Sequence, residues 1–544
     1  MPGTAMMAEG LVPVPKLIPK TLSSGADAGR TAPDAHSAEQ DRTMTLTRLP
    51  RATPSSRDVD AAGITRFLDA VQLAGLELHS FIVFKDDAVV AEAFWKPFGP
   101  DRPHMQHSAT KSWTAVAVGF VQADGLLDLD DKVVDFFPEH LPAEISPNLA
   151  AMTVKDLLTM RTGHRTGLSG GEWRYLTGSW IEAFLNEPVV ERPGTRFVYS
   201  SGSSYMLSAI VTKLTGQTVS DYLEPRLFRP LGMGEIGWDV SPEGISTGGN
   251  GLSCSAEDMM KFSVLHLQDG MWNGQQVIPA DWVRATRHNH VGEFEMMSFD
   301  GKRYRPADPD GVPDIRPGYG YQWWTTPHGG TRAAGVFGQY YILLPEQRAA
   351  ITVTAALPLS EKRLLSTVWA ELFPALTQPG SAAADAALAS RLATLAMPVE
   401  MGALQSPRAA EISGRSIRFA PNANQVSEAS LSFGAGSCEF RLVDHRGTHR
   451  VTLGLGHGIE GQTTMSGQDL HHAYQPDRMR VIASGVWRDE ATFVMTWRYV
   501  ETVFCDTVIL RITGDTVEID RSVNVNAGLT KHPTLSGSLS RAAA

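Results

Sequence analysis

The sequence predicts an α/β (α+β) protein in two parts, an N-terminal domain with helices on an antiparallel sheet and a C-terminal all-β domain. Strand-like runs at 81–84 and 89–94 precede a series of helical segments, and further runs at 340–344 and 350–355 follow it. From about residue 415 the pattern changes to short alternating strands, which is typical of a barrel or a sandwich. A chain of 544 residues is also too long for a single hydrophobic core, so more than one domain is expected.

Helical segments occupy the region between the two pairs of strands. In each of them, apolar residues recur at the spacing of one helix face. Helices interleaved with antiparallel strands at both ends predict an α/β sandwich closed by one sheet. One expected helix begins within 108–111 and ends before Gly125. The other expected helices cover 58–74, 154–160, 203–214, 256–267 (capped by Ser255) and 362–373.

Composition divides the chain into four segments. Residues 1–50 are rich in Ala, Pro, Gly, Ser and Thr, and we expect them to be disordered. We expect the α/β domain over 55–376 and a linker with an Ala-rich helix over 377–410. The C-terminal β domain, a barrel or lipocalin-like fold, then covers 411–544.

Charge and composition exclude several classes of partner. The net charge of -11 provides no basic surface for nucleic acid, and no apolar run reaches the roughly 18 residues of a membrane-spanning helix. Cys254, Cys438 and Cys505 lie far apart without metal-ligand spacing, so we expect buried thiols. The first 45 residues lack the basic-then-apolar order of a signal peptide. A cytoplasmic location is therefore favoured, with a periplasmic one as the alternative.

The segment Ser108-Ala109-Thr110-Lys111 lies where a helix should begin. Residues three apart on a helix share a face, so the lysine amine can reach the serine hydroxyl. The N-terminus of a helix also favours a nearby negative charge. This arrangement predicts a serine nucleophile whose proton is held or taken by the lysine.

A second candidate is Tyr199, which precedes the buried helix at 203–214. A tyrosinate held by a lysine charge is a competent general base. His107 is adjacent to Ser108, but neighbours at a helix entry point apart, so we expect a structural role for it.

No metal or other cofactor is expected. No cluster of His, Cys, Asp and Glu has the spacing of metal ligands. The adjacent pair His471-His472 would face opposite ways on a strand, which makes it a poor chelate.

Together these residues resemble the class C β-lactamase family of serine hydrolases, which includes D-alanyl-D-alanine carboxypeptidases, penicillin-binding-like peptidases, amidases and esterases. The resemblance covers roughly 62–376 and implies a β-lactamase/transpeptidase-like fold for that region. Four further segments support it, at 125–133, 153–163, 227–233 (F-x-P-L-G-M) and 251–259 (G-L-x-S-x-x-D-M).

The resemblance implies a role for each motif residue. Ser108 would be the acylated nucleophile, Lys111 would share its proton, and Tyr199 would act as the base in acylation and help to activate water in deacylation. Backbone N–H groups of Ser108 and Gln339 would form the oxyanion hole. The family usually has an asparagine two residues after the tyrosine, where this chain has Ser201. Substrate binding should therefore differ here.

The family's third motif is a lysine or histidine, any residue, then a glycine, on the edge strand beside the nucleophile. Alignment with 335–340 places Val336 at the position of the cation, before Phe337 and Gly338. The competing match, His328-Gly329-Gly330, lies in an expected hairpin too far from Gln339. In β-lactamases this cation steers the substrate carboxylate, so Val336 predicts an inefficient β-lactamase.

Ser201, Val336, Phe337, Gly338 and Trp324 are the expected substrate contacts. Arg174 and Arg332 are alternatives for binding a substrate carboxylate, although we expect each to be solvated at the surface. Other aromatic residues near the motifs are expected mainly in the core: Trp173, Trp180, Tyr319, Tyr321 and Trp323.

We therefore expect a metal-independent serine hydrolase that cleaves peptide or amide bonds through an acyl-enzyme. Its substrate would be a small peptide, amide or ester. Linear peptides of unusual or D-amino acids are included, such as the linearised microcystin cleaved by one peptidase of the broad family. Two alternatives remain open, an esterase or acyltransferase for small acyl esters and a penicillin-binding-like sensor that turns over poorly. The oligomeric state is also open.

Overall fold

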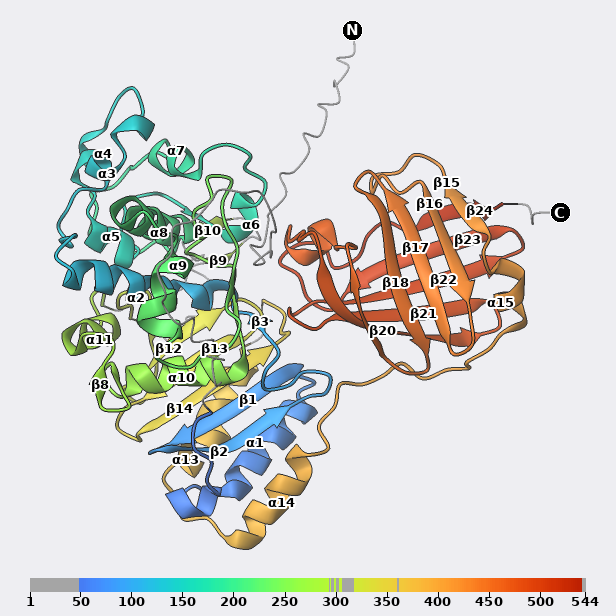
Figure 1. Cartoon of the computed structure of the whole chain (residues 1–544), viewed down its shortest axis with the longest axis horizontal. Helices are drawn as coiled ribbons and strands as arrows, with labels where there is room; N and C mark the ends of the chain where they lie inside the picture. The colour runs from blue at the N-terminus through green and yellow to red at the C-terminus, as the bar shows by residue number, and fades with distance from the viewer. Residues whose placement is uncertain are drawn as a thin grey trace, which may run out of the picture.

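The computed structural model describes residues 48–292, 294, 298–299, 303–305, 318–359 and 362–540. The N-terminal segment expected to be disordered therefore lies, over 1–47, outside the described residues. The α/β domain, blue to yellow, and a β-barrel, orange to red, lie side by side in Figure 1. Within the described ranges, every helix is too short or too polar to cross a bilayer.

Six antiparallel strands form the central sheet of the α/β domain, in the order β11-β12-β13-β14-β1-β2. The sheet joins the two ends of the domain because β1 pairs with β14, with Phe81 opposite Val353. The expected strand pairs are present, and β11 and β12 add an edge that the sequence did not indicate. The bounds are β1 (Leu78–Lys85), β2 (Ala88–Phe94), β11 (Trp324–Thr325), β12 (Thr331–Gly335), β13 (Gln339–Leu344) and β14 (Ala349–Ala355).

Helices cover both faces of this sheet, because successive strand residues point to opposite sides. Phe81 packs with α1 (Ala61–Leu73) on one face, and Ile82 belongs to the core on the other. The Ala-rich helix expected in the linker is α14 (Ala382–Leu392), whose Leu388 shares the core of α1. That layer also holds α12 (Arg363–Thr367), η5 (Val368–Leu372) and α13 (Phe373–Ala375).

The opposite layer contains the helices that carry the sequence motifs. They are α2 (Thr110–Ala123), α8 (Ser201–Thr215) and α10 (Ala256–Leu267). Trp113 of α2 stacks on Phe262 of α10, with ring centres 3.9 Å apart. Shorter helices in the domain are α3 (Val133–Phe136), α4 (Pro147–Ala151), α5 (Val154–Leu158), α6 (Gly170–Trp173), α7 (Trp180–Leu185), α9 (Val219–Leu223) and α11 (Ala280–Arg287).

A small sheet in the order β3-β6-β5 lies beside the nucleophile segment. It is formed by β3 (His104–Met105), β6 (Leu252–Cys254) and β5 (Gly237–Trp238). Other short strands are β4 (Gly167–Leu168), β7 (Met271–Trp272), β8 (Gln275–Gln276), β9 (Ser298–Phe299) and β10 (Arg303–Arg305).

The C-terminal domain is a ten-stranded sheet, of which nine strands close into a barrel and β19 pairs with β20 beside the closure. Closure results from a parallel pairing of β18 with β20, where Gly454 lies opposite Ser484. Alternate side chains fill the interior, as the alternating sequence pattern predicts. The elements are α15 (Pro407–Ile412), β15 (Ser416–Phe419), β16 (Glu428–Phe433), β17 (Ser437–Asp444), β18 (Gly447–Leu455), β19 (Ile459–Thr463), η6 (Gln468–His471), β20 (Met479–Asp489), β21 (Thr492–Tyr499), β22 (Cys505–Thr513), β23 (Thr516–Val523) and β24 (Leu535–Leu539).

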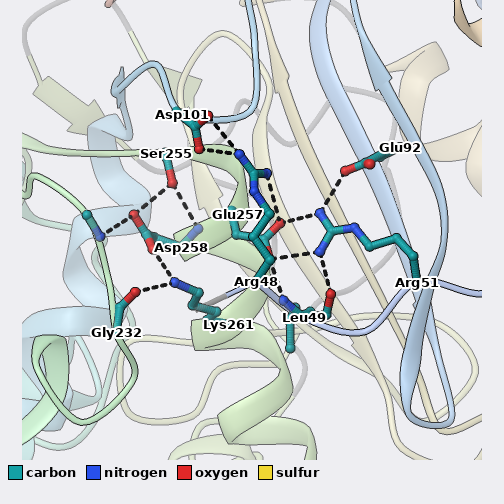
Figure 2. A network of polar contacts seen from close by, with 11 residues as sticks. Arg48, Leu49, Arg51, Glu92, Asp101, Gly232, Ser255, Glu257, Asp258 and Lys261 are labelled. Carbon is teal, nitrogen blue, oxygen red and sulfur yellow. Dashed lines mark hydrogen bonds and ion pairs between the residues drawn. The ribbon is translucent and has the colours of Figure 1, made fainter. Parts of the chain in front are cut away.

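The first turn of α10 is fixed to distant segments by buried charges (Figure 2). Glu257 accepts a hydrogen bond of 2.7 Å from the backbone N–H of Leu49 and pairs with Arg51 at 2.6 Å. Asp258 pairs with Lys261 at 3.1 Å, and both side chains are 2% exposed. Buried charges are tolerated only when paired in this way, so this turn is a structural anchor.

The same cluster connects two of the segments that support the family resemblance, 227–233 and 251–259. Ser255 caps α10, as predicted, by accepting a hydrogen bond from the N–H of Asp258. Lys261 donates to the carbonyl oxygen of Gly232 at 2.6 Å. The segment 227–233 is therefore held against 251–259 by the buried lysine.

Candidate active site

Ser108 and Lys111 lie at the entry to α2, where a short 3₁₀ turn, η2 (His107–Ala109), precedes the helix. Ser108 is partly exposed, whereas Lys111 is buried. The Nζ of Lys111 donates to the Oγ of Ser108 at 3.1 Å and to the Oγ of Ser201 at 3.0 Å. A third bond, of 2.7 Å, goes to the carbonyl oxygen of Gly249. The structure thus joins the serine and the lysine that the sequence indicates.

Burial lowers the pKa of Lys111 to about 7. The charged form is disfavoured because desolvation is not offset by a carboxylate among the described residues. A substantial fraction of this amine is therefore uncharged near neutral pH and can accept the proton of Ser108.

Tyr199 lies beside the same lysine, with the Nζ of Lys111 4.9 Å from the centre of its ring. The ring is 4% exposed and stacks on Trp324 with centres 5.2 Å apart. Tyr319 and Phe197 complete this aromatic cluster. Trp324 therefore supports the position of Tyr199, and its half-exposed side chain borders the site.

Ser201 is the first residue of α8 and occupies the position of the usual family asparagine. The loop 248–251 approaches it closely, because a Cβ on Gly249 would lie 2.9 Å from the Cβ of Ser201. Glycine is required for this approach, which also brings the Gly249 carbonyl to Lys111. Sequence reasoning missed Gly249, although the glycine-rich run 248–251 was visible.

The strand beside the Ser108 segment is β12 (Thr331–Gly335), which the sequence analysis did not predict. A Cβ on Gly335 would lie 2.2 Å from the carbonyl oxygen of Gln106, so sheet and nucleophile segment touch there. Val336, Phe337 and Gly338 form the turn from β12 to β13 instead of an edge strand. Gln339 lies opposite Gly335 at this end of the sheet, and its role as an oxyanion donor stays a prediction.

The proposed replacement cations have different environments. His328 stacks on Phe373 at 3.7 Å, so its contacts are with the helical layer of α13. Arg332 lies on β12 and donates to the carbonyl oxygen of Thr325 at 2.9 Å. Arg174 is 4% exposed, so the expectation of a solvated surface residue is wrong for it.

His107 is buried next to the nucleophile, in a left-handed backbone conformation with φ 48°. Burial, and then the charge of Arg174, lower the pKa of His107 well below its usual value. Its ring packs against Phe337 with centres 5.3 Å apart. These contacts are those of a neutral packing residue.

The barrel lies directly against this site, which sequence reasoning did not indicate. Phe337 belongs to the buried cluster of the barrel, and its ring centre is 6.1 Å from that of Phe504. Met105 donates its backbone N–H to the carbonyl oxygen of Glu501 at 2.8 Å, and Arg498 pairs with Glu77 at 2.6 Å. The two domains therefore share an interface beside Ser108.

Two predictions about ligating residues can be compared with the structure. The three cysteines are free and buried, as predicted. Over the described ranges, no group of three or more His, Cys, Asp and Glu side chains has the geometry to hold a metal ion.

A family model described as Beta-lactamase matches residues 65–370. The chain belongs to the beta-lactamase family. The match covers the sheet of the α/β domain and the segments that contain Ser108, Lys111 and Tyr199. It confirms both the resemblance and the predicted fold class.

Relatives in this family have several names. The chain is 25% identical to the 6-aminohexanoate-dimer hydrolase of Paenarthrobacter ureafaciens, over 57% of this chain and 83% of that protein. It is 28% identical to penicillin-binding protein 4 of Amycolatopsis lactamdurans, over 41% and 66% respectively. Among solved structures, the octameric penicillin-binding protein homologue from Pyrococcus abyssi aligns with 88% of this chain and 99% of that chain, at 15% identity and a TM-score of 0.45. The beta-lactamase family to which the chain belongs is thus a serine hydrolase family with amidase, carboxypeptidase and esterase relatives.

Proposed function

We propose that this protein hydrolyses peptide or amide bonds through an acyl-enzyme on Ser108. The observation that supports this most directly is the contact of 3.1 Å between the Nζ of Lys111 and the Oγ of Ser108. Because the pKa of Lys111 is lowered to about 7, its amine can act as a base at neutral pH.

Acylation would begin with transfer of the Ser108 proton to uncharged Lys111, while the Oγ attacks the substrate carbonyl carbon. The N-terminus of α2 and the backbone N–H of Ser108 would stabilise the developing oxyanion. The proton would then pass, by way of Tyr199, to the leaving nitrogen as the C–N bond breaks. Water would hydrolyse the acyl-enzyme by the reverse proton path.

An amide substrate agrees with the two proton carriers at this site. An amine is a poor leaving group unless it is protonated as the bond breaks, so amide cleavage needs a general acid near the nucleophile. Lys111 and Tyr199 lie together there. The relative from Paenarthrobacter ureafaciens is also named for hydrolysing a dimer of an amino acid.

The second candidate function is ester hydrolysis, which the names of other relatives support. The chain is 27% identical to esterase EstB of Burkholderia gladioli, over 35% of this chain and 55% of that protein. An alkoxide leaving group needs less help from a general acid, so the same residues would also cleave esters.

A matched substrate panel tests the proposal. Wild type, Ser108→Ala and the helix-cap control Ser146→Ala would be assayed with amino-acid p-nitroanilides, linear peptides of L- and D-residues, linearised microcystin and p-nitrophenyl esters. We expect amide or peptide cleavage by wild type and Ser146→Ala only. Cleavage of esters alone would favour the esterase, and activity in Ser108→Ala would refute the nucleophile. Nitrocefin belongs in the panel, and we expect slow turnover because Val336 supplies no cation at the position from which β-lactamases steer the substrate carboxylate.

A further inference from the structure

We propose that Arg174 binds a substrate carboxylate beside Ser108, and that the C-terminal barrel completes this subsite. The inference rests on the proposed function in taking Ser108 as the acylated residue. It adds acidic groups to the substrate class and gives the barrel a role in specificity.

Arg174 is a buried cation with unused hydrogen-bonding capacity. Its Nη1 donates to the carbonyl oxygen of His472 at 3.0 Å, and its guanidinium lies 5.3 Å from the ring centre of Tyr474. Its Nη2 is buried and donates to no atom in the part of the chain that the structure describes. A buried charged donor without an acceptor is costly. A carboxylate would supply both the acceptor oxygens and the opposite charge.

The position of Arg174 places this donor near the nucleophile. The preceding residue, Trp173, packs on the start of α8, with its ring 3.0 Å from the site of a Cβ on Gly202. Gly202 follows Ser201, which bonds Lys111. On its other side, Arg174 exerts the largest charge effect on His107, the residue before Ser108. Contacts of Arg174 with His472, and of the His472 ring with Phe337, connect it to His107, the residue before Ser108.

Hydrogen bonds inside the barrel fix His471, the neighbour of the subsite residue His472. His471 accepts a hydrogen bond from the N–H of Gly467 on Nδ1, so its Nε2 donates to Asp506 at 2.7 Å. Asp506 is also paired with Arg521. His471 faces the barrel interior, whereas His472 and Tyr474 face the catalytic domain. The two adjacent histidines therefore contact different domains.

Three residues with a left-handed backbone conformation meet where the two domains touch. His107, Phe337 and His472 all have positive φ, at 48°, 68° and 55°. Their rings form a chain of contacts, with centres 5.3 Å and 6.4 Å apart. Left-handed non-glycine residues are uncommon and cluster at binding sites, where the surrounding packing enforces them.

Asp239 is the carboxylate whose charge acts on Arg174, so it has to be considered as an internal partner. It is buried within electrostatic reach of Arg174, yet its Oδ2 has no hydrogen-bond partner among the described residues. The two side chains form no ion pair in the described structure, and burial raises the pKa of Asp239 to about 6. Asp239 therefore leaves Arg174 without a hydrogen-bonded counterion, so a substrate carboxylate can take that place.

The alternative is that Arg174 only fastens the barrel to the catalytic domain. Paired ester substrates separate the two roles, since activated esters need no general acid. One series has the acid on the acyl part, as p-nitrophenyl half-esters of succinate, glutarate and adipate. The other series has the carboxylate on the leaving group. Its substrate is 3-hydroxybenzoate whose hydroxyl is esterified with benzoic acid. Each acid is compared with its carboxamide.

We expect wild type to favour the acid in at least one series by about tenfold or more in kcat/KM, and Arg174→Met to abolish that preference. Arg174→Lys keeps the charge and should retain part of it. The docking control Arg498→Met removes another interface arginine and should leave the ratio unchanged. Equal use of acid and amide by wild type, or an equal loss on both in Arg174→Met, would overturn the inference.

A measurement on wild type alone avoids the question of folding. Succinate, glutarate or adipate should slow fluorophosphonate labelling of Ser108, whereas the corresponding diamides should not; equal effects would count against the subsite. A different outcome would refute the proposed function alone: cleavage of esters with this preference for the acid, but of no amide or peptide.

Discussion

The Nζ of Lys111 lies 3.0 Å from the Oγ of Ser201, nearly the same distance as from the Oγ of Ser108, the proposed nucleophile. Ser201 stands two residues after Tyr199, where the family usually has an asparagine. A short hydroxyl suffices here because the loop at Gly249 packs against Ser201 and brings its own carbonyl oxygen to Lys111. The lysine is thus positioned by three oxygen atoms from three segments.

We expect Ser201→Ala to lower kcat about tenfold, because Lys111 would lose one of its positioning hydrogen bonds. Ser201→Asn should lower it further, since Gly249 leaves little room for a longer side chain. Steady-state kinetics with one p-nitroanilide would measure both. An Asn variant with activity at or above wild type would show that the loop yields and that our packing argument is wrong.

The pH dependence of kcat/KM should follow the protonation of Lys111. Its pKa is lowered to about 7, so the amine is mostly charged below that pH and mostly free above it. With an uncharged substrate, kcat/KM should rise tenfold per pH unit below about 7 and level off above it. Lys111→Arg, which stays protonated, should be inactive throughout. A flat profile between about pH 5.5 and 8 would exclude Lys111 as the base.

Tyr199→Phe should lower kcat for an amide substrate by a factor on the order of 10² or more. The phenol oxygen is lost, while the aromatic stacking with Trp324 that holds the ring is retained. Circular dichroism and thermal denaturation should therefore match wild type. The loss should be smaller for an activated ester, which needs less protonation of its leaving group. Near-normal amide turnover would assign proton transfer to Lys111 alone.

Lys261→Met should destabilise the protein without a direct effect on chemistry. It leaves Asp258 as an unpaired charge in a site where both partners are 2% exposed, at a cost of about 3–5 kcal/mol. The matched control is Arg229→Met, whose pair with Glu224 is exposed and contributes about 0–1 kcal/mol. Urea denaturation would compare them, and the double variant Asp258→Asn/Lys261→Met should recover part of the loss. Equal midpoints for the two single variants would contradict the structural role.

Local patterns were enough to bring the proposed catalytic residues Ser108 and Lys111 together. The helical spacing after Ser108 puts Lys111 on the same face, and that geometry follows from helix dimensions alone. The capping residue Ser255 and the helix at 256–267 were likewise readable, because a cap and its helix are local features.

Features that depend on long-range packing were not predicted from the sequence. Strand β12 was missed because it is five residues long and its alternation is hidden among Gly and Ala, so Val336 was placed on an edge strand instead of in a turn. Arg174 was expected in solvent because a charged residue is exposed by default, but it is buried and contacts His472 and Tyr474 of the barrel.

The sequence by itself determined the fold class, the family and the serine–lysine pair, since periodicity and motif spacing act over a few residues. Only the tertiary structure decided that Gly249 and Ser201 share Lys111, that burial lowers its pKa, and that the barrel adjoins the site. These features depend on contacts between segments far apart in the chain, and desolvation exists only once those segments have packed together.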